Sequence, residues 1–305
     1  MGRCALPALA ALCGALLAAT PNAYGQPVLD DGMTPARARA RLGLLGLAQQ
    51  VVLPRADGLR AVRLHIIVPA GPAPAAGWPV LYLLDGNAAL QALADTGTAP
   101  AAVLVGIGYD VDARFDVAAR AWDYTPTPPP GSHGDTDPRQ AGRRNGGADA
   151  WLDLIEQRVK PLAQAAAPLD LSRQTLYGHS YGGLFVLHAL STRPRAFQRY
   201  VAASPSLWWH APYMADRLRA LDTAGCCAAA PRQLYLWVGD SERSRTQRAA
   251  PRRPVAESGG NARALAGELA DKPGLSVRFR SFPGLGHGPM LPASAREAAR
   301  IAAMP

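Results

Sequence analysis

The chain has 305 residues, 49% of them hydrophobic and 18% charged, as expected for a globular protein with a sizeable core. Its net charge is +9, but the basic residues are scattered arginines with few aromatic residues among them, which argues against nucleic-acid binding. A cationic surface would instead attract anionic small substrates. Beyond the N-terminal segment, no apolar run is long enough to cross a bilayer.

The first 25 residues have the pattern of a secretory signal peptide. Arg3 is followed by an apolar stretch, and the small residues Ala23 and Gly25 precede a plausible cleavage site before Gln26. A buried N-terminal helix is the weaker alternative. The sequence therefore predicts export to the periplasm, or secretion, of a mature chain over 26–305 that has no stable membrane insertion.

Only Cys226 and Cys227 remain once that segment is removed. Adjacent cysteines rarely pair, because disulfide geometry requires Cα atoms farther apart than neighbours comfortably allow. No disulfide framework and no zinc-binding spacing is recognisable. We therefore expect a structural or incidental role for both cysteines, and neither a cofactor nor a protein-bound metal.

Strands and helices alternate along the chain. An antiparallel strand pair is predicted at 49–54 and 59–70, and short apolar runs at 78–86 and 100–109 indicate strands covered on both faces. Further strands are expected at 173–180, 199–205, 232–240 and 275–282, and helices at 148–166, 181–192, 261–272 and 293–303. This order predicts an α/β fold with a mostly parallel sheet, helices on both faces and an antiparallel N-terminal strand pair.

One long interruption separates these units. Residues 124–147 are rich in proline, glycine and charge and have no periodicity. A segment of this kind is usually a functional lid or disordered. With no internal repeat and no second core visible, we predict a single domain over 26–305.

Ser180 lies in the sequence Gly-His-Ser-Tyr-Gly, between a predicted strand and a predicted helix. Strand, sharp turn and helix form the setting of a nucleophile elbow, and Gly178 and Gly182 leave room for the turn. In an open α/β sheet, ligands bind beyond the carboxyl ends of the strands, where Ser180 is expected. Ser180 is therefore the predicted nucleophile.

A serine needs a neighbouring base, and in this fold the histidine comes last in the chain. His287 follows the final predicted strand in a glycine-containing loop, which favours it as the base. Of the other histidines, His65 lies in an early predicted strand, His133 in the long loop and His179 in the elbow itself. His188 lies on the predicted helix after the elbow, and His210 follows two tryptophans.

The acid that orients the histidine should follow the strand at 232–240. Asp240 stands at the end of this strand and is the first candidate, and Glu242 is the second. Asp240 could equally be a turn residue, and a site without a strong acid is the third possibility. The oxyanion hole requires two backbone N–H donors, which we expect from Tyr181 and from the loop at Gly86 and Asn87.

Several segments resemble the putative-esterase branch of the α/β-hydrolases. They are PVLYLLDGNAAL, VGIGYDVDARFDVAARAWDYTP, GGADAWLDLIEQRVKPL, QTLYGHSYGGLFVLHAL and YVAASPSLWW. More narrowly they are similar to bacterial esterases of trilactone siderophores such as enterobactin and salmochelin, some of them periplasmic. The resemblance runs from about residue 50 to His287.

The resemblance implies an α/β-hydrolase fold and carboxylic ester hydrolysis, with Ser180 as nucleophile, His287 as base, and Gly86 and Tyr181 as oxyanion donors. It also implies a serine–histidine pair without a clear acid. The residues expected to contact substrate are Asn87, Arg114, Arg120, Tyr124, Trp208 and Trp209. Of these, Arg114, Arg120 and Tyr124 fall in the segment that lines the pocket in relatives. The two tryptophans could stack on catechol rings or belong to the core.

The expected partner is an anionic ferric siderophore or another ester, and any iron would arrive with it. Two other functions remain open. The first is an esterase of the feruloyl type or an acyltransferase, which keeps the chemistry and changes the substrate. The second is a non-catalytic binding module, because fold alone does not fix function.

Overall fold

The computed structural model describes residues 33–55, 58–97, 100–132, 136–138, 140–227, 229–242 and 258–305. The predicted signal peptide and His133 lie outside these residues. The central feature is a sheet of eight strands in the order β1-β2-β4-β3-β7-β8-β9-β10. Its strands are β1 (Gly46–Leu53), β2 (Val62–Pro69), β3 (Trp78–Leu84), β4 (Val103–Tyr109), β7 (Leu169–His179), β8 (Arg199–Ala203), β9 (Arg232–Gly239) and β10 (Leu275–Phe282).

The strand directions agree with the sequence pattern. β1 pairs with β2 and β2 with β4 in antiparallel fashion, and every pair from β4 to β10 is parallel. Strands β3 and β4 are apolar along nearly their whole length and buried, because helices cover both of their faces. The carboxyl ends of β3, β7, β8, β9 and β10 therefore lie along one edge of the sheet.

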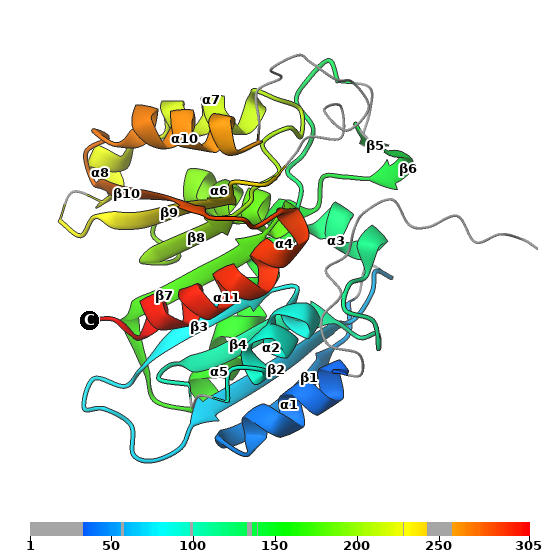
Figure 1. Ribbon diagram of the computed structural model, residues 1–305, viewed down its shortest axis with the longest axis vertical. Helices are drawn as coiled ribbons and strands as arrows, with labels where there is room; N and C mark the ends of the chain where they lie inside the picture. The colour runs from blue at the N-terminus through cyan, green and yellow to red at the C-terminus, as the bar shows by residue number, and fades with distance from the viewer. Residues whose placement is uncertain are drawn as a thin grey trace, which may run out of the picture.

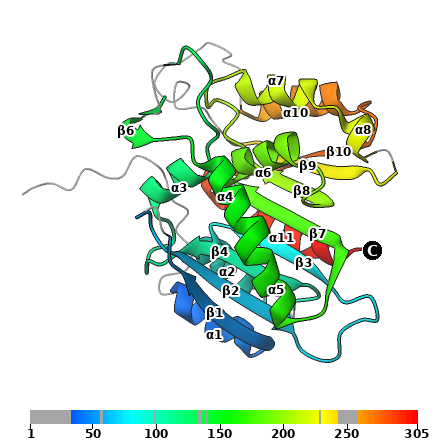
Figure 2. The same ribbon diagram turned by 180° about the vertical axis from the view of Figure 1, so that it is seen from behind.

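Helices form a layer on each face (Figures 1 and 2). On the face turned to the viewer in Figure 1 lie α1 (Pro35–Gly43), α2 (Gly86–Ala94) and α11 (His287–Ala303). Their apolar side chains form one core with Leu81, Leu83 and Tyr177 of the sheet. The other core lies against α3 (Val117–Asp123), α4 (Ala148–Leu154), the π-helical turn Ile155–Val159, α5 (Lys160–Ala166), α6 (Tyr181–Thr192), α7 (Tyr213–Ala220) and α10 (Ser258–Leu269).

The structure adds elements that the sequence pattern missed. α1, α2, α3 and α7 were not predicted, and α11 begins at His287 rather than at residue 293. Within 124–147, the described residues form a small antiparallel hairpin of β5 (Thr136–Asp137) and β6 (Gln140–Arg144). Helices α1, α2, α3 and α7 have only seven to nine residues, too few to show a clear periodicity, which explains why a pattern search overlooks them.

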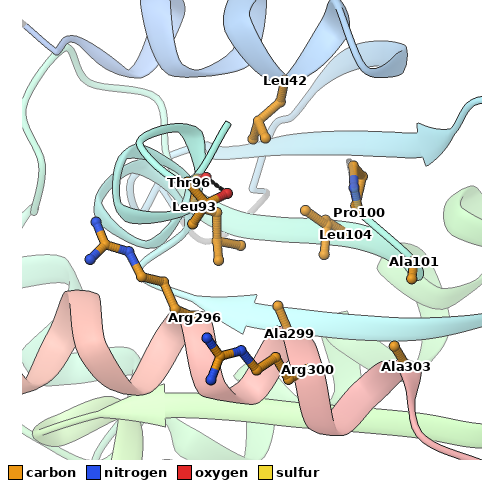
Figure 3. Close-up of a pocket in the computed structure, with 10 residues that line it drawn as sticks. All are labelled: Leu42, Leu93, Thr96, Pro100, Ala101, Leu104, Arg296, Ala299, Arg300 and Ala303. Carbon is orange, nitrogen blue, oxygen red and sulfur yellow. Dashed lines mark hydrogen bonds between the residues drawn. The ribbon is translucent and has the colours of Figure 1, made fainter. Parts of the chain in front are cut away.

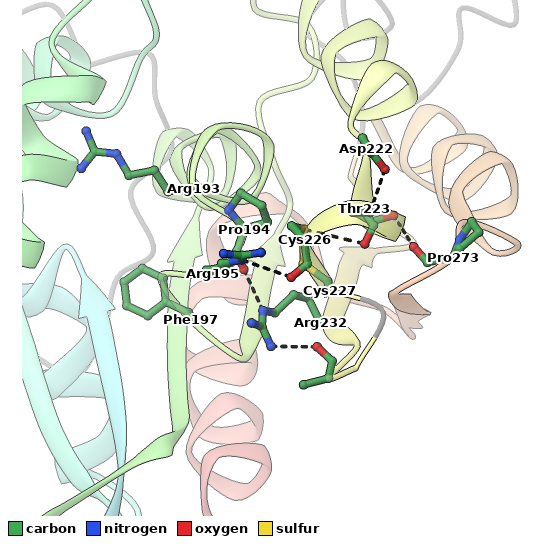
Figure 4. Close-up of a disulfide and its surroundings, with 12 residues drawn as sticks. Arg193, Pro194, Arg195, Phe197, Asp222, Thr223, Cys226, Cys227, Arg232 and Pro273 are labelled. Atoms are coloured by element: carbon green, nitrogen blue, oxygen red, sulfur yellow. Dashed lines mark hydrogen bonds between the residues drawn. A yellow bond between two sulfur atoms is a disulfide. The ribbon is translucent and has the colours of Figure 1, made fainter.

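The expectation that the two adjacent cysteines stay unpaired is wrong. Cys226 and Cys227, at the end of α8 (Thr223–Cys227), form a disulfide between adjacent residues (Figure 4). The Arg195 guanidinium donates to the Cys226 carbonyl oxygen at 3.2 Å, and Cys227 is buried. The Cα atoms are 3.8 Å apart, closer than in most disulfides. The sulfurs can still bond because both side chains turn to the same side at the end of this short helix. The bridge closes no loop and constrains only the end of α8.

Candidate active site

Ser180 occupies a strained turn between β7 and α6. Its backbone has φ 61° and ψ −116°, a conformation that costs free energy for any residue with a Cβ. The turn is fixed because the Ser180 N–H donates to the Ala203 carbonyl oxygen at 3.0 Å. It is also tight, since a Cβ on Gly178 would lie 2.2 Å from the Gly182 carbonyl oxygen. Ser180 is thus held at the carboxyl edge of the sheet, at the N-terminus of a helix.

Two further residues with a left-handed backbone lie at the same edge. Asp85 has φ 51° after β3, and Ser204 has φ 44° after β8. Backbone strain of this kind persists only where the surrounding structure enforces it, and it clusters at functional sites. Three neighbouring strand ends therefore mark this edge as the candidate site.

His287 lies at the same edge, although it comes much later in the sequence, after the last strand. It is the first residue of α11, and its backbone carbonyl oxygen accepts a hydrogen bond of 2.9 Å from His179 Nε2. Because a carbonyl can only accept, His179 carries its proton on Nε2. Burial, together with the positive charges nearby, keeps the pKa of His179 well below its ordinary value, so its ring is neutral. The residue before Ser180 thus anchors the backbone of His287.

Glu242, not Asp240, lies against the imidazole of His287. Glu242 Oε2 is 3.1 Å from His287 Nδ1, whereas the Asp240 carboxylate accepts from the Gly284 N–H at 2.7 Å. The prediction of Asp240 as the orienting acid is therefore corrected. After β9 the chain turns back, with the Glu242 N–H donating to the Gly239 carbonyl oxygen at 3.3 Å. This turn directs the second carboxylate inward and leaves the first at the surface.

The Glu242 carboxylate is buried and well supplied with donors. Its Oε1 accepts from the Gly239 N–H at 2.8 Å and from the Ser204 hydroxyl. Burial alone would raise the pKa of Glu242, but the hydrogen bonds from His287, Ser204 and Gly239 together hold this pKa below its usual value. The carboxylate is therefore ionised at neutral pH, with one oxygen facing the imidazole.

Gly86 and Tyr181 are the first residues of two helices, α2 and α6. Backbone N–H groups at such positions point outward from the helix N-terminus, where an anion can bind. Gly86 must be glycine, because a Cβ there would lie 2.4 Å from the Gly106 carbonyl carbon. Gly86 and Tyr181 follow neighbouring strands, β3 and β7, at the edge of the sheet that carries Ser180.

Tyr124 is buried, Arg120 is mostly buried, and both bind Asp85. The Arg120 guanidinium donates to both Asp85 carboxylate oxygens at 2.9 and 2.8 Å, and the Tyr124 hydroxyl accepts from the Asp85 N–H at 3.0 Å. Arg120 also reaches the His179 carbonyl oxygen at 3.4 Å. The prediction that Tyr124 contacts substrate is corrected because its side chain is completely buried, and that for Arg120 stays a prediction. Both residues fix the turn that precedes Gly86 relative to the elbow.

The predictions that Asn87 and Trp209 contact substrate are also corrected, because both side chains are buried. Asn87 is 2% exposed, and its side-chain amide donates to three backbone carbonyl oxygens of the segment after β4, those of Tyr109, Val111 and Ala113. Trp209 is completely buried, and its indole N–H donates to Asn145 Oδ1 at 2.9 Å. Both therefore hold loops in place.

Trp208 and Arg114 remain candidates for substrate contact. The Trp208 ring is partly exposed and lies 5.6 Å from the ring of Tyr181, beside the nucleophile. Arg114 is half-buried, with its guanidinium 5.5 Å from the ring of Phe115. Neither contact tests the predicted role.

Several residues that meet at the site were not predicted from the sequence. Asp137 of the β5–β6 hairpin accepts the hydroxyl of Tyr181 and lies 3.5 Å from the Arg143 guanidinium, which ties part of the predicted lid to the elbow. Ser206 is buried, with its hydroxyl oxygen 3.5 Å from that of Ser180. The only sequence signal for Ser206 was its place in the segment after β8.

A pocket of about 390 Å³ lies elsewhere, between α1, α2 and α11 (Figure 3). Its lining includes Leu104 near the start of β4 and Ala303 at the end of α11, so it opens at the end of the sheet opposite to Ser180. In the part of the chain described, no group of three His, Cys, Asp or Glu side chains could hold a metal ion. None of the described helices is long and apolar enough to span a membrane.

The strand order, the strained serine between β7 and α6, and the histidine after the last strand define the class: the chain has an α/β-hydrolase fold. Comparison with known proteins identifies the family. The family model described as "Putative esterase" matches residues 60–284. The chain belongs to this esterase family and is a carboxylic ester hydrolase.

Individual relatives match over most of their length. The ferri-bacillibactin esterase BesA of Bacillus subtilis is 34% identical over 81% of this chain and 86% of its own. The apo-salmochelin esterase of Escherichia coli is 34% identical over 79% of this chain and 74% of its own. Among solved structures, the complex of the enterobactin hydrolase IroE with DFP superposes with a TM-score of 0.66 at 30% identity, covering 85% of this chain and 96% of that one.

Proposed function

We propose that this chain is a serine esterase that hydrolyses the ester bonds of a catecholate trilactone siderophore, with Ser180 as the nucleophile and His287 as the base. The observation that carries the mechanism is the strained Ser180 at a helix N-terminus, at the same edge as a histidine backed by a buried carboxylate. The names of the related siderophore esterases support the substrate class.

Each residue has a defined task in the first half of the reaction. Because His287 Nδ1 faces Glu242, Nε2 is the nitrogen that accepts the Ser180 proton. The serine oxygen attacks the ester carbonyl carbon, and the carbonyl electron pair moves to its oxygen. The N–H groups of Gly86 and Tyr181 stabilise this oxyanion. Glu242 stabilises the imidazolium that forms.

Collapse of the tetrahedral intermediate breaks the ester C–O bond. The leaving alkoxide takes the proton from His287 and departs as an alcohol, which leaves an acyl group on Ser180. Water then attacks the acyl group with His287 again as base, and the released carboxylic acid frees Ser180. The protein needs no metal for these steps, and iron belongs to the substrate.

The charge of the protein favours an anionic substrate. Ferric tris-catecholate is negatively charged, and the chain carries a formal net charge of +9. Trp208 offers a partly exposed aromatic ring beside Tyr181 for stacking on a catechol. Arg114 is the candidate for contact with the anionic part of the substrate.

We place the enzyme in the periplasm, on the basis of the N-terminal pattern Arg3, apolar stretch and Ala23-Tyr24-Gly25. The full-length chain expressed in a Gram-negative host should be recovered from the periplasmic fraction with Gln26 as its N-terminal residue. Recovery of uncleaved chain from the cytoplasm would contradict export.

The substrate is tested by product analysis after incubation with ferric enterobactin. The wild-type protein should release linear trimer, dimer or monomer fragments, and Ser180→Ala should release none. A wild-type protein that cleaves aryl or feruloyl esters but no trilactone would refute the siderophore substrate and keep the esterase chemistry. If wild type were not labelled by a fluorophosphonate at all, a binding module would be the better description.

A further inference from the structure

The last residue of β8 and the residue after it, Ala203 and Ser204, contact both halves of the proposed catalytic machinery. The Ala203 carbonyl oxygen accepts the N–H of Ser180, and the Ser204 hydroxyl donates to Glu242 Oε1. Ser204 is 2% exposed, and its own N–H donates to the Trp237 carbonyl oxygen at 2.7 Å, which fixes its position on the neighbouring strand β9. Its side chain thus comes from a rigid part of the sheet.

The backbone at Ser204 is an unusual place for a serine. With φ 44° it lies in the left-handed region, where glycine is favoured and asparagine or aspartate is tolerated. A serine at this point costs free energy that glycine would not. Such a cost points to a function for the side chain, whose hydroxyl donates to the carboxylate of Glu242.

The two oxygens of Glu242 have different partners. Oε1 accepts from the Ser204 hydroxyl and the Gly239 N–H, and Oε2 lies 3.1 Å from His287 Nδ1. Without the Ser204 hydroxyl, Oε1 would keep only the Gly239 N–H of these two donors, and the carboxylate would have more freedom to rotate away from the imidazole. Two donors on the same oxygen fix the plane of the carboxylate.

We infer that Ser204 is a positioning residue of the active site: its hydroxyl holds Glu242 in the orientation that presents Oε2 to His287. The inference rests on the proposed function, because it assigns Ser204 a role through Glu242 and His287. Ser204 touches no reacting atom. This arrangement differs from a simple serine–histidine–acid triad, because a fourth side chain sets the geometry of the acid. That side chain, Ser204, directly follows β8, the strand beside the one that ends at the nucleophile.

The test compares two substitutions that both remove the hydroxyl. Ser204→Gly relieves the left-handed backbone, and Ser204→Ala keeps it. Thermal unfolding should therefore favour the glycine variant, whereas both should react with a fluorophosphonate about ten-fold more slowly than wild type, as expected for one lost hydrogen bond to a charged group. Ser241→Ala is the matched control, because this exposed hydroxyl in the same turn contacts Asp240 and not Glu242.

A pH profile of the labelling rate separates positioning from general loosening. Among the residues that the structure describes, Glu242 and the ring of His179 face His287, and the centroids of the two histidine rings are 4.6 Å apart. Arg120 lies beyond His179, which stays neutral. In both Ser204 variants the acidic limb should move to lower pH, because the carboxylate no longer stabilises the imidazolium fully. Ser241→Ala should keep the wild-type limb.

A double variant completes the test. If Ser204 acts through the acid, Ser204→Gly should have no further effect in a Glu242→Gln background. A wild-type rate and pH limb in Ser204→Gly, or a loss that adds fully to that of Glu242→Gln, would overturn the inference. These results would leave the proposed esterase intact, whereas a wild-type protein that fails to react with the fluorophosphonate would remove both.

Discussion

At the scale of single residues, the two carboxylates that follow β9 have different partners and different roles. Glu242 is buried and faces His287, and Asp240 is exposed and caps the backbone N–H of Gly284. They are two positions apart, yet only one lies within hydrogen-bonding distance of the imidazole. Their chemical similarity makes them a matched pair for substitution.

Glu242→Gln should lower kcat roughly a thousand-fold, because the amide no longer stabilises the imidazolium, while KM changes little. Asp240→Asn should keep kcat within about three-fold, since it alters a surface turn. Steady-state hydrolysis of a simple aryl ester measures both. A larger loss of kcat in Asp240→Asn than in Glu242→Gln would show that the acid has been assigned to the wrong residue.

A second residue-scale property is the neutral imidazole of His65. Burial in β2, with the positive charges of Arg39 and Arg63, lowers the pKa of His65 to about 4. The unfolded chain binds a proton at this group near pH 6.5 and the folded chain does not. The free energy of unfolding should therefore fall as the pH drops from about 6.5 to about 4, since the unfolded state takes up the extra proton.

His65→Leu should remove this contribution and flatten the pH dependence. Between about pH 7 and about pH 5, the wild-type protein should lose about 2 kcal/mol more of its free energy of unfolding than the variant. His179 contributes in the same direction in both proteins, so the difference isolates His65. Denaturant titrations at the two pH values measure it, and equal slopes for wild type and variant would contradict a neutral buried His65.

At the scale of elements, the elbow depends on how closely β7 and α6 approach each other. A Cβ on Gly178 would lie 2.2 Å from a backbone oxygen of α6, whereas a Cβ on Gly182 would meet nothing nearer than 3.5 Å. The two glycines of the motif are thus unequal: one is required by the backbone contact, and the other has room for a methyl group.

Gly178→Ala should push the start of α6 away from the strand, destabilise the fold by about 2–4 kcal/mol and abolish labelling of Ser180. Gly182→Ala should change the free energy of unfolding by less than about 1 kcal/mol, because the added methyl group makes only ordinary contacts. Denaturant unfolding and fluorophosphonate labelling test the pair. Equal destabilisation by both variants would mean that Gly178 and the Gly182 carbonyl oxygen are not in close contact at the elbow.

At the scale of the whole molecule, the distribution of charge bears on substrate capture. The chain carries a formal net charge of +9, or +8 without Arg3 of the predicted signal peptide. Such a surface increases the rate of encounter with an anion, and dissolved salt screens the effect.

Raising the salt concentration from about 0.02 M to about 0.2 M should therefore lower kcat/KM for a ferric catecholate several-fold. The same change should leave kcat/KM for a neutral aryl ester nearly constant, which makes the neutral ester the internal control. Identical salt dependence for the two substrates would show that long-range attraction plays no part in capture.

The sequence was sufficient for the fold and for the order of the site along the chain. Alternating apolar strands and amphipathic helices specify a parallel sheet, and an α/β sheet gathers its loops at the carboxyl ends of the strands. Ser180 and His287 could therefore be singled out without coordinates. The short helices, the β5–β6 hairpin and the bridge between Cys226 and Cys227 could not, because local pattern carries no signal for them.

The direction of individual side chains was decided by tertiary structure alone. Arg120 and Tyr124 have the chemistry of substrate-binding residues, but both turn inward to Asp85, because a charge buried beside the elbow requires a partner. Glu242 displaces Asp240 because a turn of a few residues points one carboxylate inward and the other outward. A sequence determines which groups are available at an edge of the sheet; only the packed backbone determines which of them meet, since hydrogen bonds depend on differences of an ångström that periodicity does not encode.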